Sequence, residues 1–420
     1  MKASSIVNTK LMVNNQSSLI DKLAKKFVLS ALERISVGHL ILEDQGTVFN
    51  FGESRDVATL IAHVNVHHDA FYRDTFFNRT IGAGEGFMRN NWSSPDVVKF
   101  VQLMAKNLSV VSQIDKKKPI HKKLVNKTLH LLNANTLNGS KKNISAHYDL
   151  GNDFFELFLD PTMMYSSAIF PSKEATLEQA SINKLKTICE KLQLSADDHL
   201  LEIGTGWGSL AIYAAQQYGC SVTTTTISRE QYEYAKQGVV EAGLEDKITL
   251  LLKDYRDLQG QYDKLVSIEM IEAVGHEYYE SYFTQCDKLL KHDGLMLIQA
   301  IIIPDQRYLS AKHSVDFIQR YIFPGGCLPS IEVMAACTSQ KTDMQIIKLD
   351  DITEHYANTL LHWRESFLKN IDDVQSQNFD DVFCRMWEFY LAYCEGGFRE
   401  RVIGAVQLLL AKPGYRFPKD

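Results

Sequence analysis

The feature that most constrains the fold is the stretch HLLEIGTGWGSL at residues 199–210, where an apolar strand pattern leads into three alternating glycines and then a helical pattern. Gly204, Gly206 and Gly208 permit a sharp turn and let a ligand approach the backbone amides at the start of the helix. From about residue 180 onward, helical and strand patterns alternate along the chain. Such alternation predicts an α/β fold with a mostly parallel sheet and crossover helices.

The pattern also places the elements of this sheet. Five strands are predicted at 199–204, 221–228, 248–254, 262–270 and 294–302. Helices are predicted at 209–219 and 229–243, which are the connections between the first three strands. Residues 310–335 have a less regular pattern, and 350–411 are predicted to be largely helical.

The spacing of the glycines distinguishes between cofactors. A dinucleotide-binding turn would carry its third glycine at position 209, which is Ser209, and an acid about 20 residues further on, where this chain has TTTTIS. S-adenosylmethionine needs close backbone contact but no pyrophosphate cradle, and Glu-x-Gly-x-Gly-x-Gly after a strand is the usual opening of Rossmann-like methyltransferases. The turn therefore favours S-adenosylmethionine over a nicotinamide cofactor. A purely structural turn does not explain three alternating glycines directly behind Glu202.

The N-terminal part of the chain has a different pattern. A helix, three short strands and a second helix are predicted at 15–36, 38–44, 46–53, 59–68 and 96–111. The glycine-rich segment 82–92 lacks the Gly-Lys-Ser/Thr of a phosphate-binding loop, so a turn or a domain-packing loop is predicted there. His63, His67 and His68 have no Cys or acidic partner at ligand spacing, which favours a half-exposed strand over a metal site.

Composition excludes several classes of protein. With 45% apolar and 23% charged residues, the chain has the composition of a packed globular protein, and 420 residues are enough for two domains or for one large domain with an appended one. The net charge of −6 argues against general nucleic-acid binding, and an odd number of cysteines without Cys-x-x-Cys indicates a reduced, cytoplasmic chain. The N-terminus has no continuous apolar run, so a signal peptide is not expected. The longest apolar run, 295–303, is too short for a membrane span, so any membrane contact is expected to be peripheral.

A lysine-rich segment separates the two patterns. Residues 115–142 carry eight lysines against one acid, Asp115. Ile120, Leu124, Leu131 and Leu132 recur at nearly helical spacing, so the segment could form a basic amphipathic helix. Such a helix is attracted to anionic lipid by roughly 1 kcal/mol per lysine near the surface. A solvated linker between domains is the other interpretation, and the segment alone does not decide between them.

Several longer segments resemble one family. The segments 145–167, 201–208, 226–231, 268–279, 317–330 and 387–407 together resemble the cyclopropane-fatty-acid synthases. This family includes the bacterial phospholipid enzymes and the mycolic-acid cyclopropane synthases. The resemblance covers roughly residues 145–411 and reaches 1–140 only weakly, as the N-terminal domain of the longer members.

The resemblance implies a reaction on lipid. A cis alkene is a poor nucleophile and therefore needs the activated methyl group of S-adenosylmethionine, and its methylation leaves a carbocation on the acyl chain. That cation survives only in an apolar, aromatic-lined tunnel that excludes water. A base then removes a proton from the new methyl group so that the ring closes. In the family this base resembles a bound bicarbonate, held by a glutamate, a histidine, a tyrosine and backbone amides.

The same resemblance assigns catalytic residues. It makes Glu272 the glutamate and Tyr356 the tyrosine, with backbone donors from Ser167 and Ile301. Glu272 would then be the polar residue that holds the base in an otherwise apolar pocket, and Glu269 would face the cofactor or an ion-pair partner. The alternative is that both glutamates are paired structural carboxylates at the end of a strand.

The chain departs from the family pattern at three positions. Gln299 stands where the histidine is expected, Ser167 where a cysteine is expected, and Ala273 where a histidine is common. Ser167 would contribute only its backbone amide, so that change is mild. Gln299 cannot gain charge and offers a different donor geometry, which leaves the fate of the cation open. If the proton leaves a chain carbon instead of the methyl group, the product is methyl-branched or methylene-bearing.

The turn and the resemblance also assign the cofactor site. The predicted binding residues are Tyr165, Glu202, Gly204, Gly206, Gly208, Thr226, Ser228, Gln231, Asp254 and Tyr255. Within this set, Tyr165 would form a lid together with His147, Tyr148 and Asp149. Bicarbonate is the second expected ligand, and no metal is expected.

The sequence as a whole predicts a Rossmann-like class I methyltransferase domain with a mostly parallel seven-stranded sheet, plus a smaller α+β N-terminal domain. The expected boundaries are 1–114 for the N-terminal domain, which could present lipid, 115–143 for the lysine-rich segment, and 144–420 for the methyltransferase domain.

The predicted activity is cyclopropanation of unsaturated phospholipid acyl chains by a cytoplasmic enzyme associated peripherally with the inner face of an anionic membrane. The alternatives are C-methylation of the same chains, giving methyl-branched, methylene or furan-precursor products, and a non-catalytic lipid-binding protein. A homodimer is an assembly that the sequence leaves open.

Overall fold

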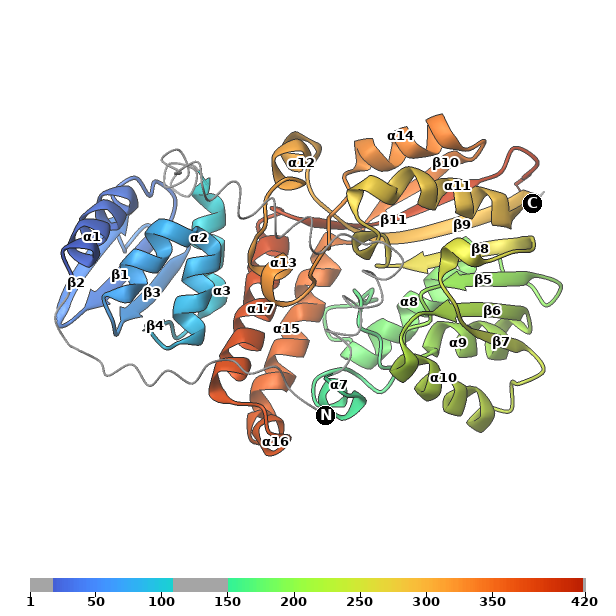
Figure 1. Cartoon of the computed structure of the whole chain (residues 1–420), viewed down its shortest axis with the longest axis horizontal. Helices are drawn as coiled ribbons and strands as arrows, with labels where there is room; N and C mark the ends of the chain where they lie inside the picture. Colours follow the sequence, from blue (N-terminus) through green and yellow to red (C-terminus); the bar gives the residue numbers. More distant parts are fainter. Residues whose placement is uncertain (1–17, 109–149, 418–420) are drawn as a thin grey trace.

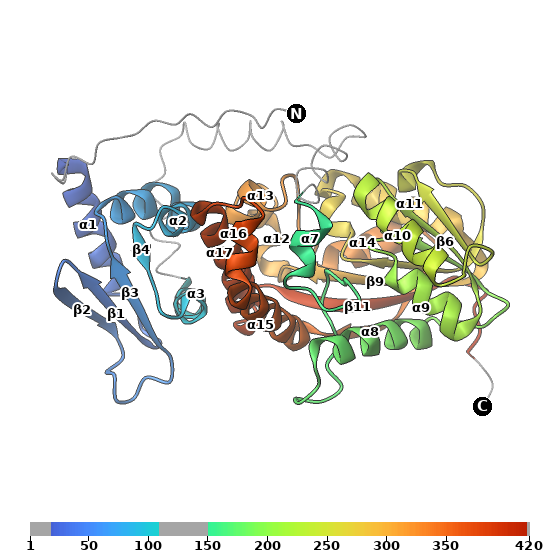
Figure 2. The ribbon, with the colours of Figure 1, turned by 90° about the horizontal axis from the view of Figure 1, so that it is seen from below.

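The computed structural model describes residues 18–108 and 150–417, which form two α/β lobes with a helical layer between them (Figure 1). The N-terminal lobe lies at one end of the molecule and the larger C-terminal lobe at the other, in both views (Figures 1 and 2). The lysine-rich segment and the predicted lid residues His147, Tyr148 and Asp149 lie outside the described residues. The expected domain boundaries at 114 and 143 also fall there and stay predictions.

The N-terminal lobe contains a four-stranded sheet in the order β2-β1-β3-β4. Its elements are α1 (Leu19–Leu32), β1 (His39–Asp44), β2 (Thr47–Gly52), β3 (Ile61–Val66), α2 (Ala70–Met88), β4 (Trp92–Ser93) and α3 (Val97–Lys106). Helices α1 and α3 and strands β1, β2 and β3 confirm the pattern predicted from the sequence. Alternate residues of β3, namely Ala62, Val64 and Val66, are buried, as expected of a strand with one face on a core.

The prediction of a turn or loop for the glycine-rich segment is wrong, because most of this segment belongs to helix α2. A Cβ atom at Gly82 would lie 1.9 Å from the carbonyl oxygen of Asp74, and one at Gly84 would lie 2.4 Å from the ring of Phe317. These glycines therefore serve close packing, within α2 and against the C-terminal lobe. The helix bends at Arg79, whose φ of 56° interrupts the helical geometry.

The C-terminal lobe contains the predicted seven-stranded sheet, in the order β10-β11-β9-β8-β5-β6-β7. Its strands are β5 (His199–Ile203), β6 (Ser221–Thr226), β7 (Ile248–Leu252), β8 (Tyr262–Ile268), β9 (Leu290–Ile302), β10 (Gln345–Asp351) and β11 (Gly404–Ala411). The pairs from β7 to β9 are parallel, and β11 pairs antiparallel with both β9 and β10. The sheet is thus mostly parallel, as predicted.

Helices cover both faces of this sheet. Helices α8 (Leu177–Lys191), α9 (Ser209–Tyr218) and α10 (Arg229–Glu241) share one apolar cluster with the strands. Helices α11 (Tyr279–Leu289) and α14 (Ile331–Lys341) share a second cluster. The lobe is therefore a three-layered α/β domain. Among the described residues, no helix combines the length and the apolar character needed to span a bilayer.

The region 350–411 is largely helical, as predicted, but its end is a strand. It contains α15 (Thr353–Lys369), α16 (Ile371–Ser376) and α17 (Asp381–Arg399), and then β11 inside the sheet. The run AVQLLLA of β11 is almost uniformly buried, and a short apolar run of this kind does not reveal its period. Sequence reasoning therefore extended the helical region eight residues too far.

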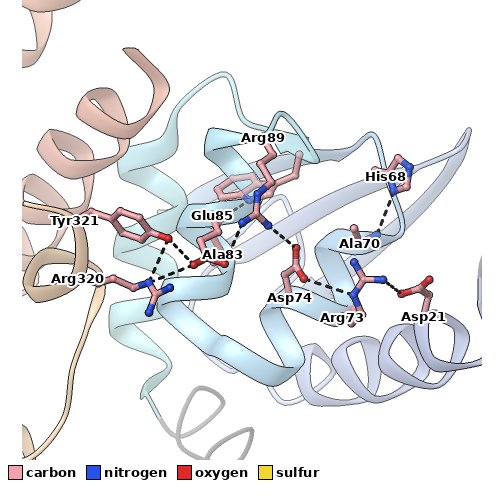
Figure 3. Close-up of polar contacts among 11 residues, drawn as sticks. Asp21, His68, Ala70, Arg73, Asp74, Ala83, Glu85, Arg89, Arg320 and Tyr321 are labelled. Carbon is pink, nitrogen blue, oxygen red and sulfur yellow. Dashed lines mark hydrogen bonds and ion pairs between the residues drawn. The ribbon is translucent and has the colours of Figure 1, made fainter. Parts of the chain in front are cut away.

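Helix α17 and the short helix α13 (Phe317–Tyr321) join the two lobes. Phe389 of α17 contacts Phe87 and Trp92 of the N-terminal lobe, with ring centroids 5.7 and 6.4 Å apart. A chain of charges continues the contact from α13 across α2 to α1 (Figure 3). The chain runs through Arg320, Glu85, Arg89, Asp74, Arg73 and Asp21. Because Tyr321 also donates to Glu85 at 2.5 Å, this carboxylate fixes the N-terminal lobe onto the C-terminal lobe.

Candidate active site

The glycine turn after β5 forms one wall of a large cavity. Gly204, Gly206 and Gly208 have φ values of 101°, 53° and 95°, which favour glycine over any residue with a side chain. Gly204 and Gly206 line the cavity, whereas Gly208 begins α9, where an added Cβ would lie 3.0 Å from the Cβ of Ala235. The first two glycines are therefore placed for close approach of a ligand, and the third for helix packing.

The structure brings eight of the ten predicted cofactor residues to this one cavity. They are Tyr165, Glu202, Gly204, Gly206, Thr226, Gln231, Asp254 and Tyr255. Besides Gly208, the exception is Ser228, which caps α10 by accepting a hydrogen bond from the backbone N–H of Gln231. Thr226 donates to Gln231 Oε1 at 2.9 Å, so the threonine and the cap together orient the Gln231 amide at the end of β6.

Two acids of this set are held firmly. Asp254 follows β7 and accepts two hydrogen bonds from the Arg256 side chain, at 2.9 and 2.7 Å, which fixes its carboxylate at the cavity wall. Glu202 in β5 accepts a 2.6 Å hydrogen bond from Thr224, and burial raises its pKa to about 8. A lysine that sequence reasoning missed, Lys184 of α8, lies fully buried nearby and donates to Ser166 at 2.8 Å.

The Glu269 side chain is held in the site by three hydrogen bonds. It follows β8 with a φ of 48°, a left-handed conformation that is uncommon for a residue with a side chain. Its Oε1 accepts from the backbone N–H of Ser167 at 2.9 Å and from Gln299 Nε2 at 2.8 Å, and its Oε2 accepts from the Tyr356 hydroxyl at 2.7 Å. Sequence reasoning expected Glu269 to face the cofactor or an ion-pair partner. It lines the same cavity as the glycine turn, its hydrogen-bond donors are these three neutral groups, and the charge of the buried Lys184 also opposes the rise of its pKa.

Gln299 is oriented by a relay of amides that the sequence did not reveal. It lies in β9 opposite Gln407 of β11, whose Nε2 donates to Gln299 Oε1 at 2.9 Å. Lys191 of α8 in turn donates to Gln407 Oε1 at 2.6 Å. This relay fixes which end of the Gln299 side chain carries the NH₂ group. That group therefore points toward Glu269 and toward the carbonyl oxygen of Ser167.

Glu272 has one oxygen in a hydrogen bond with the backbone of β9 and one orphaned oxygen. Its Oε1 accepts a hydrogen bond from the backbone N–H of Ile301, one of the two predicted backbone donors. Its Oε2 is enclosed and has no hydrogen-bond partner among the described residues. Burial and the charge of Glu269 raise the pKa of Glu272 to about 8. The structure therefore brings the other four predicted catalytic residues, Ser167, Gln299, Ile301 and Tyr356, into contact with Glu269 or Glu272.

The cavity extends from the glycine turn into the N-terminal lobe, with a volume of about 790 Å³. Around the two glutamates its walls include the aromatic residues Tyr165, Phe323, Tyr356 and Phe398. In the N-terminal lobe its walls include apolar side chains of several elements, namely Leu32, Leu40, Val64, Phe71 and Met104. The cavity thus combines a polar end with room for a long apolar ligand.

Known proteins are similar to this chain in sequence and in fold. The family model for mycolic acid cyclopropane synthetase matches residues 136–408. Tuberculostearic acid methyltransferase of Mycobacterium tuberculosis is 38% identical to this chain, and the match covers 82% of each protein. Cyclopropane-fatty-acyl-phospholipid synthase of Escherichia coli is 36% identical, and the match covers 84% of this chain and 88% of that enzyme.

Solved structures give the same result. A cyclopropane synthase of Mycobacterium tuberculosis has a TM-score of 0.61 and 31% identity, and covers 65% of this chain and 98% of its own. A mycolic acid cyclopropane synthase in complex with SAH and CTAB has a TM-score of 0.60 and 32% identity, with the same coverage. The chain therefore belongs to the mycolic acid cyclopropane synthetase family of S-adenosylmethionine-dependent methyltransferases, as the sequence motifs predicted.

Proposed function

We propose that this enzyme transfers the methyl group of S-adenosylmethionine to the double bond of an unsaturated phospholipid acyl chain and that the leading product is a cyclopropane fatty acid. The observation that carries the proposal is the single cavity, which joins the glycine turn, two glutamates and a long apolar chamber. Glu269 and Glu272 line the same cavity as the glycine turn and the apolar chamber, so a methyl donor and an acyl chain that meet there would do so close to these carboxylates.

The residues of the glycine turn fit S-adenosylmethionine. Gly204 and Gly206 leave space beside the backbone for its amino-acid moiety, Gln231 offers an oriented amide, and Asp254 and Tyr255 stand at the end of β7 for its adenosine part. When bound, S-adenosylmethionine supplies a sulfonium-activated methyl group. Tyr165, which donates to or accepts from Tyr390 at 2.8 Å, would close the site between donor and acyl chain.

The cavity walls suit a cationic acyl chain. Tyr356 stacks on Phe398 with ring centroids 4.4 Å apart, and Tyr165 lies 5.2 Å from Trp363. Aromatic faces stabilise a nearby positive charge, and a wall of this kind excludes water that would trap the cation as an alcohol. These residues would therefore protect the intermediate until a proton leaves.

The chamber in the N-terminal lobe gives that lobe a role in presenting lipid. Its apolar residues line the same cavity as the site, so we propose that it holds the distal part of the acyl chain while the headgroup stays near the membrane. Attachment to the inner face of an anionic membrane through lysines 115–142 remains a prediction for a segment outside the described residues.

A separate bicarbonate does not fit the donors that the sequence resemblance assigned to it. The N–H groups of Ser167 and Ile301 and the hydroxyl of Tyr356 each have one hydrogen, and each donates it to Glu269 or Glu272. Both hydrogens of the Gln299 amide are used as well. We therefore assign no step to bicarbonate.

A second candidate function is C-methylation of the same acyl chains without ring closure. It is favoured by Gln299 in place of the expected histidine, and by similarity to proteins named tuberculostearic acid methyltransferase and, in Pseudomonas putida, probable fatty acid methyltransferase, the latter at 37% identity. The third alternative, a non-catalytic lipid-binding protein, is disfavoured by the intact glycine turn and paired glutamates.

Expression in a bacterial host that lacks its own cyclopropane synthase tests the proposal. NMR of the extracted fatty acids should show cyclopropane protons in cells with the wild-type chain and none in cells with an empty vector. Methyl or methylene signals in place of ring signals would select C-methylation. Unmodified unsaturated chains would contradict both activities.

A further inference from the structure

The position of Glu269 in the site suggests how the proton is removed. Its carboxylate receives hydrogen bonds from Ser167, Gln299 and Tyr356, which are three of the groups that the sequence resemblance assigned to bicarbonate. These donors come from separate parts of the chain, the segment before α8 and the elements β9 and α15. A carboxylate and bicarbonate present the same pair of oxygens to such donors. Glu269 therefore occupies the anion site with a group of the protein itself.

We propose that Glu269 is a built-in carboxylate base that takes the place of bicarbonate, so that this enzyme needs no dissolved anion for turnover. The inference rests on the proposed function and names the proton acceptor of the same site. Glu269 lines the cavity beside Met270, and a Cβ atom added at Gly204 of the cofactor turn would lie 3.6 Å from the Cβ of Met270. The carboxylate thus stands between the glycine turn and the acyl chamber, where the reacting methyl group must lie.

The backbone of Glu269 supports this assignment. Its left-handed φ of 48° is maintained by a 2.7 Å hydrogen bond from its own N–H to the carbonyl oxygen of Gln299. A strained residue at the end of a strand is commonly associated with a functional site, because the surrounding structure must hold it there. Here the strain turns the side chain toward Ser167 and Tyr356.

The surroundings of the two glutamates favour Glu269 over Glu272 as the base. Three donors favour the ionised form of Glu269, while burial raises its pKa above the ordinary value and so makes it a stronger base. Within the described part of the chain, Glu272 has only backbone donors, from Ile301 and from its own residue, and burial together with Glu269 raises its pKa to about 8. The three donors therefore favour Glu269 as the member of the pair that ionises.

The proton transfer balances without another reagent. The alkene electron pair forms the bond to the methyl carbon as the carbon–sulfur bond breaks and its electrons stay on sulfur. A Glu269 oxygen then takes a proton from the new methyl group, and the electrons of that C–H bond close the ring onto the cationic carbon. The carboxyl group later releases the proton to solvent, so one proton is produced per turnover.

The decisive experiment measures turnover of the purified enzyme, with S-adenosylmethionine and unsaturated phospholipid vesicles, in buffer freed of carbon dioxide. Wild type should be equally active with and without added bicarbonate at matched ionic strength. Glu269→Gly, which removes the carboxylate and also relieves the left-handed strain, should lose at least 100-fold activity and recover part of it when bicarbonate or formate is added. The control is Gln193→Gly, which relieves a similar left-handed strain (φ 55°) at an exposed residue just after α8. This variant should behave as wild type.

Wild-type activity that requires bicarbonate would overturn the inference while leaving the proposed function intact. Full activity of Glu269→Gly without any added anion would also overturn it. The absence of methyl transfer by wild type under every condition would instead contradict the proposed function. Because the comparison of wild type with and without bicarbonate needs no variant, a Glu269→Gly protein that fails to fold does not prevent a result.

Discussion

Glu269 and Glu272 present two carboxylates to one cavity from positions three residues apart, and the negative charge of Glu269 raises the pKa of Glu272. Their hydrogen bonds differ, since Glu269 accepts from Ser167, Gln299 and Tyr356, whereas the donors to Glu272 are backbone groups of Ile301 and of its own residue. This difference favours Glu269 as the member of the pair that ionises.

The neutral state of Glu272 predicts a pH-dependent stability. Burial and Glu269 raise the pKa of Glu272 from 4.5 to about 8 in the folded protein. Between these values the folded chain keeps a proton that the unfolded chain releases, so the contribution of protonated Glu272 is fully present at low pH and is lost as pH rises toward 8. Glu272→Gln should therefore be more stable than wild type at about pH 8.5, by on the order of a few kcal/mol.

Urea unfolding at several pH values measures this effect. The gain from Glu272→Gln should shrink as the pH falls and level off below about pH 4.5, where wild-type Glu272 becomes protonated in the unfolded chain as well. Glu245→Gln, an exposed control in the same lobe, should match wild type throughout. A stability difference that is constant with pH would show that folding does not raise the pKa of Glu272.

Gln299 should matter through Glu269. Gln299→Leu removes one donor from the Glu269 carboxylate and leaves the Gln407 amide without its partner, which costs about 1–3 kcal/mol of stability. We expect kcat to fall at least tenfold with little change in KM for S-adenosylmethionine. The acidic limb of the pH–rate profile should also shift to higher pH, because a carboxylate with one donor fewer is easier to protonate. A variant in which only KM changes would place Gln299 in cofactor binding instead.

The N-terminal chamber should set the accepted chain length. Val64→Phe fills space at a buried position of the chamber wall, and an enlarged side chain there costs about 1–3 kcal/mol of stability. In competition assays with mixed phospholipids, the variant should shift its products toward shorter acyl chains. An unchanged product distribution in a folded variant would show that the chain does not enter the N-terminal lobe.

The two lobes should separate more easily without Glu85. Glu85→Gln weakens the hydrogen bond from Tyr321 and removes the attraction of Arg320 and Arg89, at a cost of about 1–3 kcal/mol. Limited proteolysis should cut this variant faster than wild type, and Glu33→Gln, on the exposed surface of the same lobe, should be cut at the wild-type rate. Equal rates for all three proteins would mean that other contacts between the lobes, such as the Lys106–Glu400 ion pair at 2.7 Å, hold them together without Glu85.

The sequence predicted the sheet and the glycine turn because their signals are local. The strand at 199–204 and the glycines behind it carry their own periodicity and conformational preference. The glycines at 82–86 gave the wrong prediction of a loop, and the close packing that requires Gly84 is against Phe317, which is more than 200 residues away in the chain. Local composition does not contain that contact.

The site shows the same limit. The spacing of Glu269 and Glu272 is visible in the sequence, and the resemblance identified Ser167, Gln299 and Tyr356 as donors. Which of the two carboxylates receives those donors depends on the left-handed turn at Glu269 and on the packing of α15 against the sheet. Lys184, Lys191 and Gln407 carry no motif at all and emerge only from the assembled structure.

The most direct test of methyl transfer to lipid uses S-adenosylmethionine with a fully deuterated methyl group and vesicles of an unsaturated phospholipid. NMR and mass spectrometry of the recovered fatty acid should show a ring carbon that retains two of the three deuterons, because one leaves in the deprotonation step. A lipid fraction without any deuterium after complete incubation, from enzyme that binds S-adenosylmethionine in calorimetry, would contradict the account.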